Sequence, residues 1–154
     1  MSQVLQNENI QQQEQDRNAL LEAKSLISSV PTAALKNEVI ATLFRHYLDI
    51  LAPWYDLNDS QSLFSTLVPH LSLTNPILFK AVIAFSACHE SRTSSGGRYQ
   101  DLGHVYHAAC VRDLLGVLND VNPEIQGDDL ASTCLLRSYE ILNGKMVWSS
   151  WFRK

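Results

Sequence analysis

The fold is decided by residues 75–92, NPILFKAVIAFSACHESR, the part of the chain in which apolar residues are densest. Asn75 is a favourable N-cap and Pro76 suits the first helical position, so a helix is expected to begin here. Lys80 is the only charged residue of the stretch before Glu90, so apolar residues surround the helix instead of forming one stripe. Such a helix lies in a protein core or spans a membrane. A membrane span needs roughly 20 apolar residues, and this stretch is too short. We therefore expect a central core helix against which the other helices pack.

Composition sets the class of protein. The chain has 154 residues, of which 45% are hydrophobic, enough for one core and one domain. The formal net charge is -4 and the twelve basic residues form no run, so we expect no direct nucleic-acid binding by this chain. The N-terminus has no signal-peptide pattern, which predicts a protein that stays inside the cell, away from membranes. Three cysteines in apolar helical patterns predict buried free thiols: Cys88, Cys110 and Cys134.

Apolar residues recur at intervals of three and four along most of the chain, and no segment alternates as a strand does. The fold class predicted is all-α, an antiparallel helical bundle or array of about five to six helices. Its domains are a Gln-rich N-terminus (1–15) that is disordered or frayed, a helical region (16–144) and an irregular tail (145–154). Expected helices run from about Asp16 to Pro31, Leu35 to Pro53, Asn58 to Pro69, Asn75 to Ser94, Arg98 to Asn119 and Asp128 to Gly144.

Helix-end signals refine these boundaries. Asn58 with Gln61 resembles a capping box for the short third helix, and Asp128 or Asp129 can cap the last helix. Gly144 suits the position after that helix ends. The last helix is expected to present one broad apolar face made of Leu130, Cys134, Leu135, Ser138, Ile141 and Leu142.

A metal site is considered on His104, His107 and Cys110, with the neighbouring pair Cys88-His89. Positions spaced by three stay roughly aligned on a helix. Structural zinc sites, however, take ligands from close Cys or His pairs in turns, and the chain has no Cys-x-x-Cys or His-x-x-x-His. We therefore predict no metal ligand and no cofactor. Ordinary helix packing accounts for these residues.

Catalytic pairs are also considered. Cys88 with His107, or Ser86 with His89, offers a nucleophile and a base, but Cys88 lies in the most apolar stretch, where burial makes a thiol inert. The carboxylate pairs are Asp56 with Asp59 and Asp128 with Asp129; helix capping explains both pairs. The prediction is that the chain is not an enzyme and has no catalytic residue.

Between residues 52 and 140 a set of motifs occurs in a fixed order: APWYD (52–56), Phe64, LVPHL (67–71), NPILFKAVIAFSACH (75–89), Arg92, YHAAC (106–110), Leu114-Leu115 and LLRSYE (135–140). Together they resemble the fungal-specific regulatory domain of binuclear zinc-cluster transcription factors. The resemblance spans about Leu43 to Gly144. It implies an all-α regulatory domain of a nuclear transcription regulator, with a protein partner (itself or a related factor) and a small-molecule effector.

The chain also departs from this family pattern. No cysteine precedes Leu43, so no residue inherits the role of a zinc ligand or a DNA contact of the six-cysteine module. Trp148 and Trp151 resemble the start of the family's next segment, which leads to the expectation of a truncated gene model and an incomplete domain. Apolar helix faces left bare would then make the isolated chain marginally stable and prone to associate. Two alternatives stay open: a helical interaction module that pairs with a full-length relative, and a metal protein or enzyme.

Overall fold

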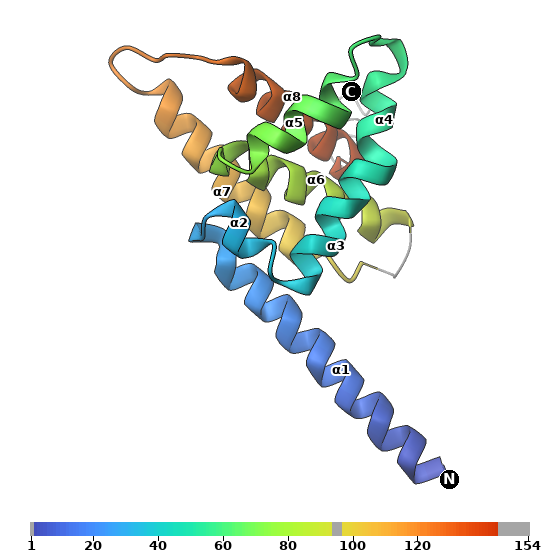
Figure 1. Cartoon of the computed structure of the whole chain (residues 1–154). Coiled ribbons are helices and arrows are strands. Elements are labelled where there is room, and N and C mark those ends of the chain that lie inside the picture. Colours follow the sequence, from blue (N-terminus) through green and yellow to red (C-terminus); the bar gives the residue numbers. More distant parts are fainter. Residues whose placement is uncertain (1, 94–96, 145–154) are drawn as a thin grey trace, which may run out of the picture.

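The computed structural model describes residues 2–93 and 97–144, and every regular element within them is helical (Figure 1). The prediction of an all-α helical array is thus confirmed. The tail at 145–154, with Trp148 and Trp151, lies outside the described residues. The elements are α1 (Ser2–Ser25), η1 (Leu26–Ser28), α2 (Pro31–Ala34), α3 (Glu38–His46), η2 (Tyr47–Leu51), α4 (Ala52–Tyr55), η3 (Asp56–Asn58), α5 (Leu63–Ser72), α6 (Pro76–Thr93), α7 (Gln100–Leu118) and α8 (Gly127–Asn143).

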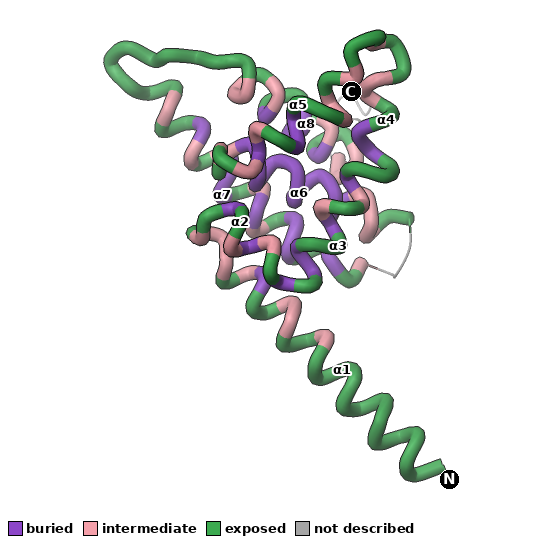
Figure 2. The backbone as a smooth tube through the Cα atoms, viewed as in Figure 1, coloured by how far each residue is buried: buried purple, intermediate pink, exposed green. Residues whose placement is uncertain are grey.

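Helix α6 is the central helix that the sequence predicts. Every residue from 78 to 88 is buried, and Figure 2 shows this buried stretch at the centre of the helical body. The Asn75 side chain accepts hydrogen bonds from the backbone N–H groups of Ile77 (3.0 Å) and Leu78 (3.2 Å), as an N-cap does. Burial of a side chain such as Leu78 contributes about 1.5–3 kcal/mol. No helix among the described residues is long and apolar enough to cross a membrane.

Two hydrophobic clusters form on α6, and they use different faces of it. One cluster joins α6 residues such as Ile83 to α1, α3 and α7, and includes the fully buried Tyr106. The other joins α6 residues such as Val82 to η2, α5 and α8, and includes Leu135. Helices α7 and α8 make the most extensive contacts with α6. Because other helices pack on both sides of α6, its residues must be apolar on all faces.

Helix α1 begins at Ser2, so the expected start near Asp16 is corrected. Figure 1 shows its N-terminal part projecting from the helical body, and residues 2–15 are all exposed. The C-terminal part docks on the core, where Ala23 is fully buried and its carbonyl accepts a hydrogen bond from the Tyr106 hydroxyl at 2.9 Å. Docking holds the C-terminal part of α1 in the helical conformation. Each further residue can then add one backbone hydrogen bond, so the helix extends into the exposed polar segment.

Two prolines do not end helices as expected. The chain runs from α3 through the π-helical η2 into α4, where Pro53 lies in the first turn. The Ala52 N–H bonds to the Tyr47 carbonyl, a wider i to i-5 pairing that admits a residue without an N–H. Pro69 lies inside α5, not after it. Both boundaries are corrections to the sequence-based expectation.

The start of α5 is capped by aspartates and not by the pair Asn58 and Gln61. The Asp56 carboxylate accepts hydrogen bonds from the N–H groups of Phe64 (2.9 Å) and Ser65 (2.7 Å). Asp59 accepts from those of Gln61 (2.9 Å) and Leu63 (3.2 Å). The expected box assumes that the helix starts directly after Asn58, whereas Asn58 is the last residue of η3 and a loop at 59–62 separates it from α5. Capping therefore occupies the carboxylate pair of Asp56 and Asp59.

Helix α8 buries a different face from the one expected. Ser132, Leu135, Leu136 and Tyr139 are buried, whereas Leu130, Cys134 and Ile141 of the predicted face are exposed. The N-cap of α8 is Gln126, and not Asp128 or Asp129. Gln126 and Asp129 form a capping box, in which the Asp129 carboxylate accepts a hydrogen bond from the backbone N–H of Gln126. Asp128 instead accepts a hydrogen bond from the Asn75 side chain at 2.6 Å. The helix ends at Asn143, one residue before Gly144, which is its C-cap.

Candidate functional site

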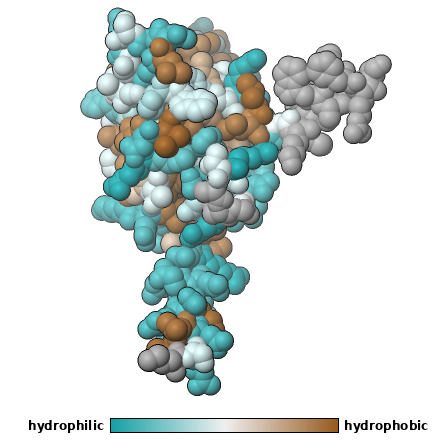
Figure 3. Space-filling model, turned by 90° about the vertical axis from the view of Figure 1, so that its right-hand side faces the viewer, coloured by the Kyte–Doolittle hydropathy of each residue, from teal (hydrophilic) through white to brown (hydrophobic). Residues whose placement is uncertain are grey.

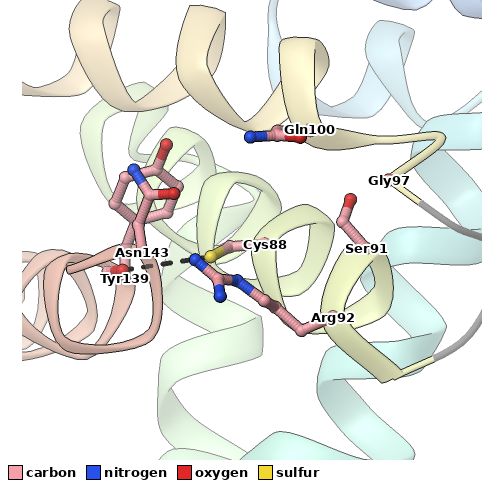
Figure 4. A pocket seen from close by; sticks show the side chains of 7 residues that line it. All are labelled: Cys88, Ser91, Arg92, Gly97, Gln100, Tyr139 and Asn143. Carbon is pink, nitrogen blue, oxygen red and sulfur yellow. Dashed lines mark hydrogen bonds between the residues drawn. The ribbon is translucent and has the colours of Figure 1, made fainter. Parts of the chain in front are cut away.

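A polar pocket of about 400 Å³ lies where the last turns of α6 and α8 meet the start of α7 (Figure 4). We call it the polar pocket. Residues spaced by three and four share one helix face, so α6 and α8 each bring neighbouring side chains to it. At the edge of the polar pocket, Gly97 has a φ of 86° and turns the chain toward α7. The lining residues are Cys88, Ser91, Arg92, Gly97, Gln100, Tyr139 and Asn143.

The Cys88 thiol forms the floor of the polar pocket. Its sulfur donates a weak hydrogen bond to the Tyr139 carbonyl at 3.9 Å, drawn in Figure 4. Burial raises the pKa of the thiol, and the nearby Arg92 guanidinium offsets only part of that effect. Cys88 therefore stays a neutral thiol at pH 7.

Hydrogen-bond donors line the rest of the polar pocket. The Ser91 hydroxyl is buried and has no hydrogen-bond partner among the described residues. In Figure 4 it points toward Gln100, with Asn143 across the pocket and the Arg92 guanidinium beside Cys88. No carboxylate lines the pocket among the residues that the structure describes. The arrangement can hold a small polar or anionic molecule.

An apolar groove of about 420 Å³ lies on another side of α8, against α4 and α6. Trp54 and Ile141, at its rim, are 71% and 58% exposed. Beyond it, a second groove of about 560 Å³ runs between α5 and α8 and includes the exposed Leu67 and Leu130. The Tyr55 hydroxyl bonds to the Cys134 carbonyl at 3.2 Å, so this side chain separates the two grooves.

These grooves form part of an apolar surface that is exposed in the described part of the chain. Figure 3 shows apolar patches between polar areas on the helical body, whereas the projecting part is mostly hydrophilic. We call the open apolar surface of α4, η3, α5 and α8 the exposed apolar surface; its members are Trp54, Leu57, Leu63, Leu67, Leu130 and Ile141.

The side chain beside His89 is His46, and not Ser86, which is considered above as its catalytic partner. Its Nδ1 lies 2.9 Å from Nε2 of His46, whose Nδ1 lies 3.1 Å from a Glu90 carboxylate oxygen. Burial and the charge of His46 lower the pKa of His89, while Glu90 partly opposes them. The Ser86 hydroxyl is buried without a hydrogen-bond partner among the described residues. The structure thus does not assemble Ser86 and His89 as a nucleophile and base.

His104 and His107 both contact Tyr139 of α8, whereas Cys110 bonds to α6. His104 Nδ1 lies 2.7 Å from the Tyr139 hydroxyl, and the His107 ring stacks on the Tyr139 ring with centroids 4.2 Å apart. The Cys110 thiol donates to the Ile77 carbonyl at 3.3 Å, and burial raises its pKa to about 12. Among the described residues no three His, Cys, Asp or Glu side chains come close enough to hold a metal ion.

Sequence reasoning misses most of the polar pocket and one buried ion pair. Ser91, Gln100 and Asn143 look like ordinary helix-end residues in the sequence, and only the meeting of three helices brings them together. Lys80, with a side chain 11% exposed, forms an ion pair with Asp113 of α7. A single charge within the buried apolar part of a helix is a signal for such a pair, because a buried charge needs a partner.

The structure defines an all-α helical array with a polar pocket and two apolar grooves in its described part. The model of the fungal specific transcription factor domain matches residues 42–154, and the chain belongs to this family. Its role is therefore in the regulation of transcription. No curated protein and no solved structure was found to match the chain.

Proposed function

We propose that the chain forms the first helices of the regulatory domain of a zinc-cluster transcription factor, acting in the nucleus on transcription by RNA polymerase II. The family match is the observation that carries the proposal, because it includes every helix around the polar pocket and both grooves. The chain itself makes no DNA contact in this proposal, since its net charge of -4 gives little attraction for phosphates.

The regulatory domain works, in this proposal, through contact with other protein helices. The exposed apolar surface supports it, because contiguous apolar patches commonly mark protein contacts. Trp54 and Ile141 lie at the rim of one groove and Leu130 lies in the next, so a helix laid along α8 would cover both. That helix belongs to the rest of the transcription factor or to a related factor.

A reporter assay tests the proposal. The chain is fused to an unrelated DNA-binding domain, and transcription from its target promoter is compared with that of the DNA-binding domain alone. We expect the fusion to change transcription, and the double variant Trp54→Ser, Ile141→Ser to abolish at least half of the change. Val121→Ser, at a 92% exposed loop position, is the matched control and should have no effect. A fusion indistinguishable from the DNA-binding domain alone would contradict the proposal.

The exposed apolar surface also favours a second candidate, a helical interaction module that pairs with a full-length relative. In that case the fusion is silent alone, and the chain copurifies with a co-expressed zinc-cluster factor. The Trp54→Ser, Ile141→Ser variant then loses copurification, whereas Val121→Ser retains it.

A further inference from the structure

We propose that the polar pocket between α6, α7 and α8 is a binding site for a small organic carboxylate. The binding site stands on the geometry of the pocket alone. Its role as the effector site of a transcriptional regulator rests on the function proposed above. Nothing in the family match assigns a ligand to these residues.

The charge in the pocket comes from Arg92. Among the described residues its guanidinium is in no ion pair, whereas Lys80 and Arg98 each pair with an aspartate. The neighbour of Arg92 inside the pocket is the neutral Cys88 thiol. A guanidinium without a carboxylate partner matches a ligand carboxylate, which it can bind through two parallel hydrogen bonds.

The neutral lining residues supply further donors. The buried Ser91 hydroxyl lacks a partner among the described residues, and a buried polar group without one costs free energy that a ligand atom would recover. The amides of Gln100 and Asn143 face the pocket from α7 and α8 (Figure 4). They can donate to the second carboxylate oxygen or to a neighbouring polar group, while Tyr139 and Cys88 contact the hydrocarbon part.

The dipoles of the helices that begin or end at the pocket limit its affinity for a carboxylate. The N-terminus of α7 favours an anion, and its N-cap residue, Tyr99, provides no side-chain cap. The C-termini of α6 and α8 also lie here and oppose an anion, so the Arg92 charge must exceed both. Arg92 is exposed, and water weakens its interaction. We therefore expect dissociation constants on the order of 1 mM for simple carboxylates.

The size of the pocket selects a small ligand. Its volume of about 400 Å³ falls in the lower part of the range of roughly 300–1,000 Å³ that is common for ligand pockets. A peptide or a dinucleotide exceeds this space. A metabolite with one or two carboxylates and a short hydrocarbon body fits it.

The test titrates the purified chain with benzoate and succinate, each compared with its neutral amide, benzamide or succinamide. Protein-observed NMR follows the side-chain amides of Gln100 and Asn143. We expect at least one carboxylate to shift both signals with saturation, and its amide to bind at least tenfold more weakly. No saturable shift with either carboxylate up to 20 mM, about twentyfold above the expected dissociation constant, would overturn the proposal. Equal binding of carboxylate and amide would also overturn it.

Variants identify the pocket as the place of binding. Arg92→Gln should weaken carboxylate binding at least tenfold, and Ser91→Ala should weaken it two- to fivefold. Arg137→Gln is the matched control, because Arg137 is exposed on α8 and does not line the pocket. Each variant is checked for an unchanged thermal transition; if Arg92→Gln unfolds, Ser91→Ala decides. Wild-type affinity in the folded Arg92→Gln variant would place the ligand elsewhere.

The reporter fusion separates this inference from the proposed function. A fusion that changes transcription while the chain binds neither carboxylate retains the function and removes the binding site. Binding that depends on Arg92 without any effect of the carboxylate on the reporter retains the site and removes its role as an effector site. A silent fusion with intact carboxylate binding removes the proposed function alone.

Discussion

Asp56 illustrates how a residue that resembles a catalytic group serves the fold. Burial alone would raise the pKa of its carboxyl, but the side-chain hydrogen bond from Ser65 and the backbone N–H groups of Phe64 and Ser65 outweigh it and lower the pKa from 3.8. The charged form is therefore favoured in the folded state. These hydrogen bonds at a helix start are enough to explain why a carboxylate stands at this position.

Replacing Asp56 by Ala should cost about 1 kcal/mol at pH 7, the usual value of a lost helix cap. The folded pKa lies below the unfolded value of 3.8, so the stabilisation is present above about pH 3.8 and is lost as the pH falls through the folded pKa. Urea unfolding at pH 7, 5 and 3 measures this difference. Asp49→Ala, at an exposed position of η2, is the control. A difference from the wild type that does not shrink toward pH 3 would contradict the assignment.

At the scale of elements, prolines and glycines act according to the local hydrogen bonds and space. Pro53 is accommodated after a π-helical turn, and Pro69 is accommodated inside α5. Gly144 ends α8 for a steric reason: a Cβ atom there would lie 2.6 Å from the Glu140 carbonyl oxygen. Gly116, within α7, faces open space, since a Cβ atom there would meet nothing within 4 Å, and the position does not require glycine.

Alanine at these two glycines should have opposite effects. Gly144→Ala forces the end of α8 to shift and should destabilise the chain by about 1–3 kcal/mol, as overpacking does. Gly116→Ala adds helix propensity in open space and should stabilise it by about 0.5–1 kcal/mol. Thermal unfolding followed by far-UV circular dichroism compares the two variants with the wild type. Stabilisation by Gly144→Ala would show that the last turn of α8 is not packed as described.

At the scale of the whole molecule, the central helix is covered while much of the outer apolar surface is open. Both faces of α6 lie in hydrophobic clusters. The exposed apolar surface on α4, η3, α5 and α8 has no cover in the described part of the chain. Association is favourable because it removes such area from water, at about 25 cal/mol per Å².

The isolated chain should therefore associate at high concentration and have a thermal midpoint that depends on concentration. Sedimentation velocity between about 5 and 200 µM measures the association, over a range typical of weak interfaces. The Trp54→Ser, Ile141→Ser variant should shift the equilibrium toward monomer, and Val121→Ser should not. A sharp, concentration-independent transition from a monomer would contradict the prediction.

The sequence alone determined the features that depend on local chemistry. The N-cap at Asn75, the dense apolar run after it and the absence of strand patterns predicted a central helix in an all-α array. The ordered motifs from residue 52 to residue 140 indicated the family, which the match over residues 42–154 establishes. These signals are readable in one dimension because caps and periodicity involve residues only a few positions apart.

Only the tertiary structure decided which faces meet. The apolar surface of α8 is broader than its contact with α6, so periodicity could not tell that Tyr139 is buried while Cys134 and Ile141 are exposed. The polar pocket joins residues of three helices, and the pair of Lys80 with Asp113 joins two. Such contacts depend on how each helix is rotated and packed against distant segments, which local sequence signals do not specify.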